Sequence, residues 1–274
     1  MEKSVRQAVA FIRSRYDEPL TLNEVAAEVF VSPYHFSRIF SRAIGLTPGR
    51  YLTAVRLFAA KRMLLTTDLT VSDIVCSVGY NSVGTFTSRF TRAVGMSPTQ
   101  YRDPAVSRLL VAASDDFARL PDLADMIEAS RSRPQLNGCA HSLSGTLDIP
   151  WSAGRTDALV GVFSDAAPQG APVAFEAFTA RGRTEFEVTG VPSGPHHVIA
   201  VAMPHGARGE QRRVLTANTR GHVKIACGIN TYVSLSMAPT EETAPPIAVT
   251  LADTSASGVE FRRSGDPRLQ PTVA

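Results

Sequence analysis

Two stretches of this chain repeat one pattern, and the repetition limits the fold of the first hundred residues more than any other feature. HFSRIFSRAIGLTPGRYL at 35–52 and TFTSRFTRAVGMSPTQYR at 85–102 lie 50 positions apart. The positions they share are Phe36, Phe40, Arg42, Ala43, Gly45, Pro48 and Tyr51, which recur as Phe86, Phe90, Arg92, Ala93, Gly95, Pro98 and Tyr101. A solenoid needs at least three repeats to bury a continuous face, so a paired unit is expected.

Helix start and stop signals surround both copies. A Ser or Thr stands at the N-cap of every expected helix after the first, which runs through Val5 and Tyr16. Its side-chain oxygen can accept a hydrogen bond from a free amide of the first turn; these residues are Thr21, Ser32, Thr47, Thr70, Ser82 and Ser97. Gly45 and Gly95 stand where a helix ends in a left-handed residue. Each copy therefore predicts a short helix, a tight bend and a second helix, and Thr47-Pro48 begins a longer helix that continues through Met63.

A short helix, a tight bend and a second helix with a polar outer face describe a helix-turn-helix. The second helix of such a unit fits the major groove of DNA, where each base pair presents its own donor and acceptor pattern. The outward residues of the first copy are Tyr34, His35, Ser37, Arg38 and Arg42. Arg38 is the candidate base reader, because a guanidinium can bridge guanine O6 and N7, and Arg42 is better placed for phosphate. The helix N-termini at Ser32 and Ser82 offer free amides to phosphate oxygens.

Charge is distributed unevenly along the chain. Residues 1–102 contain 13 Lys and Arg against 7 Asp and Glu, a net charge of +6, whereas the remainder carries −3. A basic segment beside an acidic one favours a polyanionic partner for the basic segment. Many basic helical surfaces bind nothing, and a repeated helical hairpin that serves only packing is the alternative interpretation.

The residues of both copies resemble the DNA-binding domain of AraC/XylS-type transcription regulators. The resemblance covers about residues 4–102 and includes SPYHFSRIFSRAIGLTPGRYL and DIVCSVGYNSVGTFTSRFTRAVGMSPTQYR. It implies seven helices, with recognition helices at 33–44 and 83–94 in two helix-turn-helix units. The resemblance also implies a joining helix at about 48–65, which would be ~27 Å long at ~1.5 Å per residue. Successive major grooves on one DNA face are ~34 Å apart. One chain could therefore read two grooves.

Matched residue by residue, the family's base or backbone contacts fall on Tyr34, Ser37 and Arg38 in the first unit and on Val83, Gly84, Thr87 and Ser88 in the second. Arg92, the counterpart of Arg42, joins this DNA-binding set. The second unit departs from the pattern, because Ser88 stands at the place of Arg38 and Arg89 is displaced by one position. One position turns a side chain by ~100° around a helix. We therefore expect the first unit to supply most of the base readout, and the second to supply phosphate contacts, apolar contacts or looser specificity.

Beyond residue 102 the periodicity changes. We expect a partly helical linker at 103–143, followed by a β-sandwich at 144–251 and a flexible tail at 252–274. Short alternating runs separated by Gly, Pro, Asn or Ser are typical of sandwiches and barrels. The predicted fold class is multi-domain α plus β, with an N-terminal all-α, seven-helix double helix-turn-helix domain at 1–102 and a C-terminal all-β antiparallel sandwich.

Two features of the β-rich half bear on its architecture. The stretch FEVTGVPSGPHHVIAVA at 186–202 resembles the strand–turn–strand of transthyretin-like and carboxypeptidase-regulatory-like sandwiches, with His196 at the place of a Tyr. Trp151 lies near a strand start and is expected in the core, whereas an exposed Trp there would mark a partner surface.

The sequence shows no site for catalysis, a metal or a cofactor. His196 and His197 are neighbours in an expected strand and so point to opposite faces, and no CxxC or HExxH spacing supports them or His205 and His222. No nucleophile–base pair or glycine-rich phosphate loop is evident. We therefore predict no enzyme activity, no cofactor and no metal.

Cysteine usage and hydropathy bear on location. Cys76, Cys139 and Cys227 are far apart and odd in number, which argues against a disulfide framework and fits a reducing cytoplasm. No apolar run approaches the ~20 residues of a membrane span, and the charged start MEKSVRQAVAFIRSRY is unlike a signal peptide. We expect a cytoplasmic protein with no membrane partner.

The prediction is a sequence-specific transcription regulator that binds double-stranded DNA. RNA polymerase, a small-molecule effector and a second copy bound through 144–251 are its further candidate partners. The alternative is a protein-interaction β-sandwich scaffold that carries a low-specificity, architectural DNA-binding module. A DNA-repair sensor would need a cluster of cysteines, which the spacing does not provide.

Overall fold

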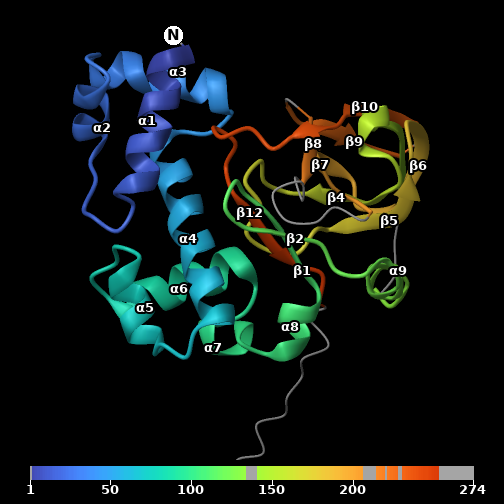
Figure 1. Cartoon of the computed structure of the whole chain (residues 1–274), viewed down its shortest axis with the longest axis horizontal. Helices are drawn as coiled ribbons and strands as arrows, with labels where there is room; N and C mark the ends of the chain where they lie inside the picture. The colour runs from blue at the N-terminus through green and yellow to red at the C-terminus, as the bar shows by residue number, and fades with distance from the viewer. Residues whose placement is uncertain (1, 134–140, 206–213, 220, 228–229, 253–274) are drawn as a thin grey trace, which may run out of the picture.

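The computed structural model describes residues 2–133, 141–205, 214–219, 221–227 and 230–252. Helices make up its N-terminal part and strands most of the rest, and the two parts lie side by side along α4 (Pro48–Thr66) (Figure 1). The predicted combination of a helical part and a β-rich part is therefore confirmed. Among the described residues, no helix is both long enough and apolar enough to cross a membrane.

The helices of the N-terminal part begin and end where the sequence signals place them. Their order is α1 (Glu2–Ser14), α2 (Leu22–Glu28), α3 (Pro33–Ile44), α4 (Pro48–Thr66), α5 (Val71–Ser77), α6 (Val83–Val94) and α7 (Pro98–Tyr101). All six predicted N-caps accept a hydrogen bond from the third amide of their helix. Thr21 and Thr70 form complete capping boxes with Glu24 and Asp73.

The residues that recur in the two copies form equivalent aromatic clusters in the two units. Two phenylalanines and a tyrosine are fully buried in each unit: Phe36, Phe40 and Tyr51 in the first, and Phe86, Phe90 and Tyr101 in the second. The centroids of the second Phe ring and the Tyr ring are 5.6 Å apart in the first unit and 5.5 Å apart in the second, with interplanar angles of 83° and 86°. Such edge-to-face pairs add ~0.5–1.5 kcal/mol beyond burial.

The segment expected to be a linker at 103–143 is packed structure in its described part. It contains α8 (Pro104–Arg108) and α9 (Leu123–Arg131), as its helical pattern suggested, but also strands β1 (Leu110–Ala113) and β2 (Ala118–Arg119). All four residues of β1 are buried, and β1 pairs antiparallel with β12 (Ile247–Thr250) at the other end of the chain. A run such as LLVAA is apolar on both faces, so its period could not distinguish a buried strand from a helix.

The described strands of the β-rich part form three sheets. The first has the order β12-β1-β2; the second is β10-β3-β6; and the third is β11-β8-β7-β4-β5, with β9 pairing to β7. The remaining strands are β3 (His141–Asp148), β4 (Thr156–Phe163), β5 (Ala174–Ala180), β6 (Arg183–Val191), β7 (Gly194–Pro204), β8 (Leu215–Asn218), β9 (Val223–Ile225), β10 (Thr231–Ser236) and β11 (Ala238–Pro239). β10 runs parallel to β3, so the strand pairing is not antiparallel throughout as expected.

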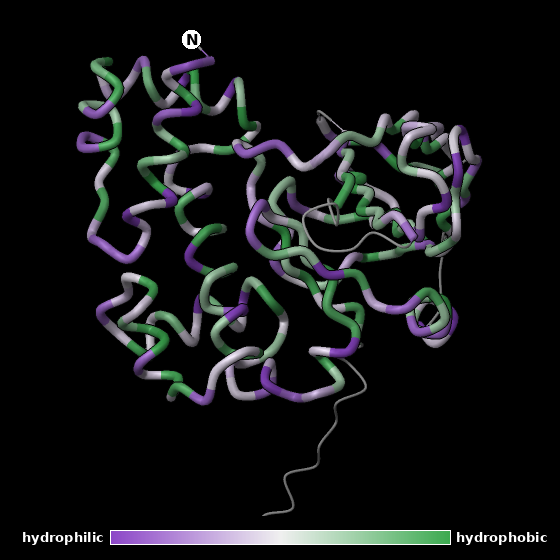
Figure 2. Tube along the Cα trace, in the orientation of Figure 1, coloured by the Kyte–Doolittle hydropathy of each residue, from purple (hydrophilic) through white to green (hydrophobic). Residues whose placement is uncertain are grey.

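The central strands β4 and β7 are buried on both faces. Ala158 and Val160 of β4 pack in a cluster with β3, β6 and β10, whereas Leu159 and Phe163 pack on the opposite side with β1, β12 and α9. Hydrophobic residues therefore follow one another along these strands (Figure 2). This explains why ALVGVF and VIAVA are nearly continuous apolar runs rather than alternating ones. The β-rich part is layered, with the six-stranded sheet between the other two.

Two smaller expectations for this part have different outcomes. Trp151 lies in a short 3₁₀ turn, η1 (Trp151–Ala153), and 73% of its surface is exposed, so its expected place in the core is wrong. Its ring edge lies against Gly182, where a Cβ would come within 2.9 Å, and the Arg181 guanidinium lies 5.6 Å from the ring centroid. The expected tail at 252–274 lies outside the described residues apart from Ala252.

The helical and β-rich parts share one hydrophobic core. Val106, Leu110, Ala112 and Ala248 of the C-terminal part pack in the same cluster as the buried residues of α4, α5 and α6. The Phe58 and Phe117 rings, from opposite sides, lie 6.2 Å apart. α4 is therefore buried nearly all round, which is typical of a helix enclosed by other elements.

The side chain of Lys61, on α4, is buried between the helical and β-rich parts. Its side chain is 1% exposed, and its ammonium donates to Gln169 O at 2.7 Å, Gln169 Oε1 at 3.0 Å and Ala248 O at 2.7 Å. The three donors of an ammonium are thus all used. Ala248 lies in β12, so Lys61 satisfies a carbonyl of that strand.

Burial should make the stability of the protein depend on the titration of Lys61. Loss of water around the ammonium lowers the pKa of Lys61 to about 7, whereas an unfolded Lys has a pKa near ~10.4. Between these values the unfolded chain binds a proton that the folded chain does not, so stability rises with pH. We expect the free energy of unfolding of the wild type, relative to Lys61→Met, to rise by ~1 kcal/mol per pH unit above neutrality. Denaturant titrations of both proteins at several pH values measure this difference in the free energy of unfolding. If the difference does not change with pH, the three hydrogen bonds keep Lys61 charged.

Candidate nucleic-acid interface

The two candidate recognition helices are built alike. α3 and α6 occupy 33–44 and 83–94, as predicted, and each is followed by a left-handed glycine, Gly45 at φ 80° and Gly95 at φ 89°. The N-cap Ser32 accepts from His35 N at 3.4 Å, and Ser82 accepts from Thr85 N at 3.3 Å. Each helix buries its phenylalanine face and leaves the opposite face toward solvent.

The predicted contact residues lie on the outward faces of these helices. Those that are exposed are Tyr34, His35, Arg38, Arg42, Val83, Gly84, Ser88 and Arg92. Ser37 and Thr87, at equivalent places in the two copies, are partly buried. The N-caps Ser32 and Ser82 are exposed as well. The fold therefore leaves the predicted residues within reach of a partner on two separate helices.

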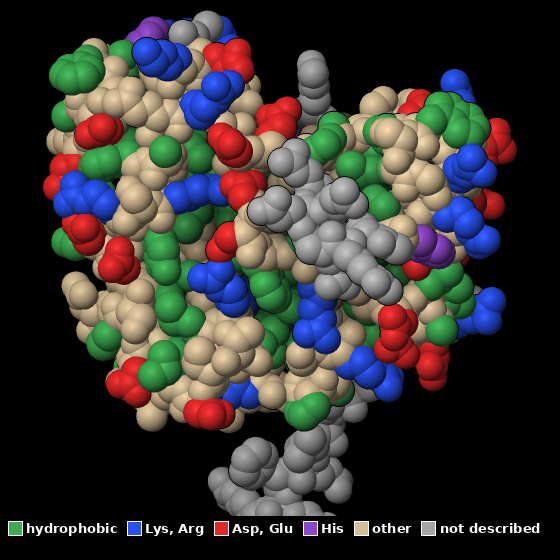
Figure 3. Space-filling view, viewed as in Figure 1, with side chains coloured by type: hydrophobic (Ala, Val, Ile, Leu, Met, Phe, Trp, Pro, Cys, Tyr) green, Lys and Arg blue, Asp and Glu red, His purple; other side chains and the backbone are tan. Residues whose placement is uncertain are grey.

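The charges on this surface are unbalanced. Neither α3 nor α6 contains Asp or Glu. Four exposed arginines project from them: Arg38, Arg42, Arg89 and Arg92. None of the four forms an ion pair within the described ranges, whereas Arg13, Arg50 and Arg62 are paired with acidic residues of the C-terminal part. Figure 3 shows acidic and basic side chains gathered where the two parts meet.

Arg38 is oriented by its neighbour on the helix. Its guanidinium lies 5.9 Å from the centroid of the Tyr34 ring, one turn earlier, and 75% of the Tyr34 surface is exposed. A cation held over an exposed aromatic face keeps its hydrogen-bond donors free. The pair thus presents a planar donor group and a flat apolar face together.

The second recognition helix presents a different surface. Val83 is 42% exposed, and a Cβ added at Gly84 would meet no atom closer than Ser82 Oγ at 4.0 Å. A glycine inside a helix costs ~0.5–1 kcal/mol relative to alanine, and packing does not require one here. Gly84 therefore leaves the first turn of α6 open to close approach by a partner backbone.

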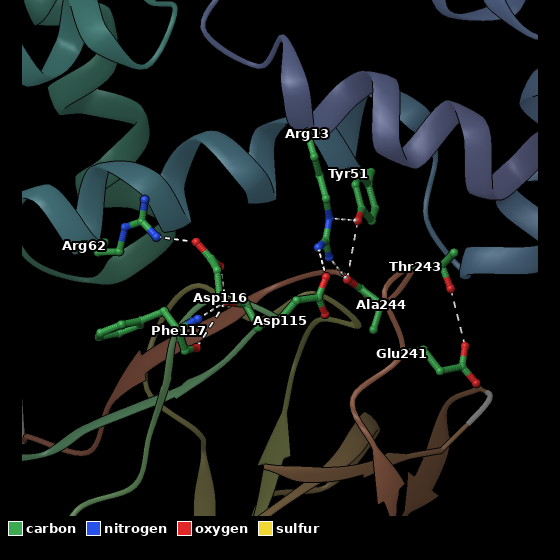
Figure 4. Close-up of polar contacts among 10 residues, drawn as sticks. Arg13, Tyr51, Arg62, Asp115, Asp116, Phe117, Glu241, Thr243 and Ala244 are labelled. Carbon is green, nitrogen blue, oxygen red and sulfur yellow. Dashed lines mark hydrogen bonds and ion pairs between the residues drawn. The ribbon is translucent and has the colours of Figure 1, made fainter. Parts of the chain in front are cut away.

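Sequence reasoning did not find the polar contacts that join the two parts. Arg13 of α1 pairs with Asp115 and donates to Tyr51 Oη at 3.0 Å and Ala244 O at 2.8 Å, and Arg62 of α4 pairs with Asp116 (Figure 4). Both aspartates stand in the turn between β1 and β2. The adjacent acids of SDDF at 114–117 were the available signal, but spacing alone could not assign their partners.

The histidines and cysteines do not gather into a site. His196 is buried and its Nε2 lies 2.9 Å from Pro192 O, whereas the ring of His197 lies 4.4 Å from that of His222. Burial and the neighbouring His222 lower the pKa of His197. Within the described residues, no three His, Cys, Asp or Glu side chains are grouped as metal ligands. Cys76 and Cys227 are free and exposed, and Cys139 lies outside the described residues.

Comparison with known proteins places the matches in the helical part. A family model described as a helix-turn-helix domain matches residues 25–104. The chain is similar to the melibiose operon regulatory protein of Escherichia coli (strain K12), at 40% identity over 98 residues, covering 36% of this chain and 32% of that protein. It is similar to the lactose operon transcription activator of Staphylococcus xylosus, at 31% identity over 102 residues, covering 37% of each. The chain thus spans about a third of the length of these relatives.

Further matches include a bifunctional protein and solved structures. The bifunctional transcriptional activator/DNA repair enzyme AdaA of Bacillus subtilis (strain 168) is 34% identical over 92 residues, covering 34% of this chain and 44% of that protein. The DNA-binding domain of AdpA in complex with a target DNA aligns with a TM-score of 0.36 and 28% identity, covering 38% of this chain and 94% of that chain. The C-terminal domain of AraT from Geobacillus stearothermophilus aligns with a TM-score of 0.35 and 36% identity, covering 36% and 83%.

Proposed function

We propose that this chain, whose residues 25–104 form a helix-turn-helix domain of the AraC type, is a sequence-specific, DNA-binding transcription regulator of the cytoplasm. The observation that carries the proposal is the pair of recognition helices α3 and α6, with four unpaired arginines and no acidic residue. Because these helices carry positive charge and no acidic side chain, they attract DNA phosphates, and their arginine N–H donors remain free to contact base edges. α4, which joins the two units, has 19 residues and is therefore ~28 Å long, a length comparable with the ~34 Å between successive major grooves on one face of DNA.

The two helices have different tasks in this proposal. α3 supplies direct readout through Arg38 and Tyr34, because a guanidinium can address both acceptors of a guanine. α6 has Ser88 at the place of Arg38 and Gly84 at the place of Tyr34, so it contributes phosphate contacts and close apolar approach. Arg42 and Arg92 contact phosphate in the two half-sites.

The C-terminal part is proposed to act on DNA binding through α4. It contacts the first unit at Arg13, the joining helix at Lys61, and the second unit near α6, where a Cβ at Gly170 would lie 3.1 Å from Ala93 O. It can therefore bias the relative position of the two recognition helices. Sensing of an effector, dimerisation and contact with RNA polymerase are the roles compatible with this position.

Two arginines on one helix test the assignment. Arg38→Ala is expected to relax discrimination at one base pair by ~1–3 kcal/mol, because the lost contact is to a base edge. Arg42→Ala, one turn away, is the matched control and should weaken binding to all sequences while reducing the salt slope by ~1. Fluorescence anisotropy with single-base operator variants over a range of salt concentrations measures both. Unchanged discrimination in Arg38→Ala would contradict its role as a base reader.

Selection of DNA by the purified chain tests the function itself. Random duplexes retained by the full chain should converge on a site with two half-sites one helical turn apart, and base substitutions should cost more in one half-site than in the other. Competition with nonspecific DNA should give a specificity ratio of ~10³ or more. A ratio well below this would favour the low-specificity scaffold instead, and equal penalties in both half-sites would refute the division of tasks between α3 and α6.

A further inference from the structure

A cavity lies at the joint between the helical and β-rich parts. Its volume is about 250 Å³, and both parts contribute to its wall. The helical part supplies Arg13, Tyr16, Val55, Phe58, Ala59 and Arg62, and the C-terminal part supplies Ser114, Asp115, Asp116 and Pro246. Pockets for drug-sized ligands begin at ~300 Å³, so this cavity suits a smaller molecule.

The wall combines apolar side chains with charges of both signs. Val55, Phe58 and Ala59 of α4 are buried apolar lining residues. The four residues of two partly exposed ion pairs, Arg13–Asp115 and Arg62–Asp116, line the cavity as well (Figure 4). The ligand must therefore carry a hydrophobic body of modest size and a polar head that tolerates two arginines and two aspartates.

The two ion pairs differ in how easily they open. Arg13 is also bound to Tyr51 Oη and Ala244 O, and the side chains of its pair with Asp115 are 24% and 32% exposed. The side chains of Arg62 and Asp116 are 37% and 63% exposed, and such exposed pairs contribute little to stability. The head group of a ligand would therefore enter at Arg62 and Asp116.

The charges around this pair decide the chemical class of the head group. A carboxylate alone would contact Arg62 but would lie near both aspartates, and an amine alone would lie near both arginines. A molecule with both groups can place its carboxylate on Arg62 and its ammonium on Asp116, so neither charge is left unpaired. Ser114 Oγ donates to Asp116 Oδ1 at 2.7 Å and so holds the carboxylate that would accept from the ammonium of the ligand.

We propose that this cavity binds a zwitterion with an apolar side chain, of the class of the free hydrophobic α-amino acids. The ligand would touch α4, the turn between β1 and β2, and the segment before β12, and so would join the two parts. Binding of this molecule goes beyond the proposed function and does not depend on it; only its effect on DNA affinity would.

Calorimetric titration of the full chain, without DNA, tests the proposal. L-Phenylalanine and L-leucine at millimolar concentrations should give saturable binding, and 3-phenylpropionate and phenethylamine, which each lack one charge, should bind about tenfold more weakly or worse. In spectra of the chain labelled at alanine methyl groups, the Ala59 signal should shift with L-phenylalanine. If neither amino acid binds, or if 3-phenylpropionate binds equally well, the proposal fails.

Charge variants separate recognition from a structural role. Asp116→Asn should weaken L-phenylalanine binding about tenfold yet strengthen that of 3-phenylpropionate, because the repelling carboxylate is gone. Arg62→Gln should weaken the binding of both L-phenylalanine and 3-phenylpropionate and strengthen the binding of phenethylamine. Asp125→Asn is the matched control and should change none of them; it removes the α9 acid that pairs with Arg108 of α8, with side chains 27% and 65% exposed. If Asp116→Asn shifts all three ligands in the same direction, the site is not a zwitterion site. Because DNA is absent throughout, failure here leaves the proposed function untouched.

Discussion

Replacing Phe90 by alanine is expected to lower the free energy of unfolding by ~3–5 kcal/mol. The Phe90 ring is fully buried and lies between those of Phe86 and Tyr101, with centroids 5.5 Å away in both cases. The variant removes this ring from the centre of the second unit, where few neighbours can move to fill the space, because α4 and β1 close the same core. Urea denaturation followed by the helical circular dichroism signal measures the change.

The matched control for Phe90 is another phenylalanine of the helical part. Phe30, in the turn between α2 and α3, is 92% exposed, so Phe30→Ala should change the free energy of unfolding by no more than ~0.5 kcal/mol. A similar loss in both variants would show that the second unit is not held by its aromatic core. Because Phe90 also supports α6, DNA affinity should fall in Phe90→Ala even at temperatures where the chain remains folded.

The helical part could be predicted from the sequence because its signals are local and repeated. N-caps such as Thr21 and Ser82 act within one turn, and the C-terminal glycines Gly45 and Gly95 act at one residue. Because the same pattern occurs twice, each copy supported the prediction made for the other: Phe36 and Phe86 were both expected on the buried face of their helix. The outward residues Tyr34 and Arg38 followed from the same periodicity.

The β-rich part and the joint between the parts depend on contacts that are distant in sequence. β1 pairs with β12 across more than a hundred residues, and no local signal at LLVAA identifies that partner. Lys61 stands in an apolar stretch, FAAKRMLL, where a lysine would ordinarily reach solvent; only the arrival of Gln169 and Ala248 explains its burial. Trp151 was misplaced for the converse reason, because its size suggested a core position while η1 turns it outward.

Reversing the charge of Lys61 is expected to separate the two parts of the molecule. Lys61→Glu would put a carboxylate against Gln169 O, Gln169 Oε1 and Ala248 O, three acceptors that now receive hydrogen bonds. An uncompensated buried charge costs ~3–5 kcal/mol, and opening of the joint would return the carboxylate to water. Burial raises the pKa of a carboxyl group, so the loss of stability should be larger at pH 8 than at pH 5.

Lys224→Glu supplies the matched control, because Lys224 is exposed on β9 and the same change of charge there should leave stability within ~0.5 kcal/mol. Limited proteolysis and the radius of gyration from X-ray scattering report on the joint, since an open joint exposes the apolar residues Phe58, Leu110 and Ala248. DNA affinity measured on the same variant then tests the proposed action through α4. If the joint opens and DNA affinity is unchanged, the C-terminal part does not act through α4. If the joint stays closed at pH 8 and the free energy of unfolding falls by less than ~1 kcal/mol, Lys61 is not the contact that holds the two parts together.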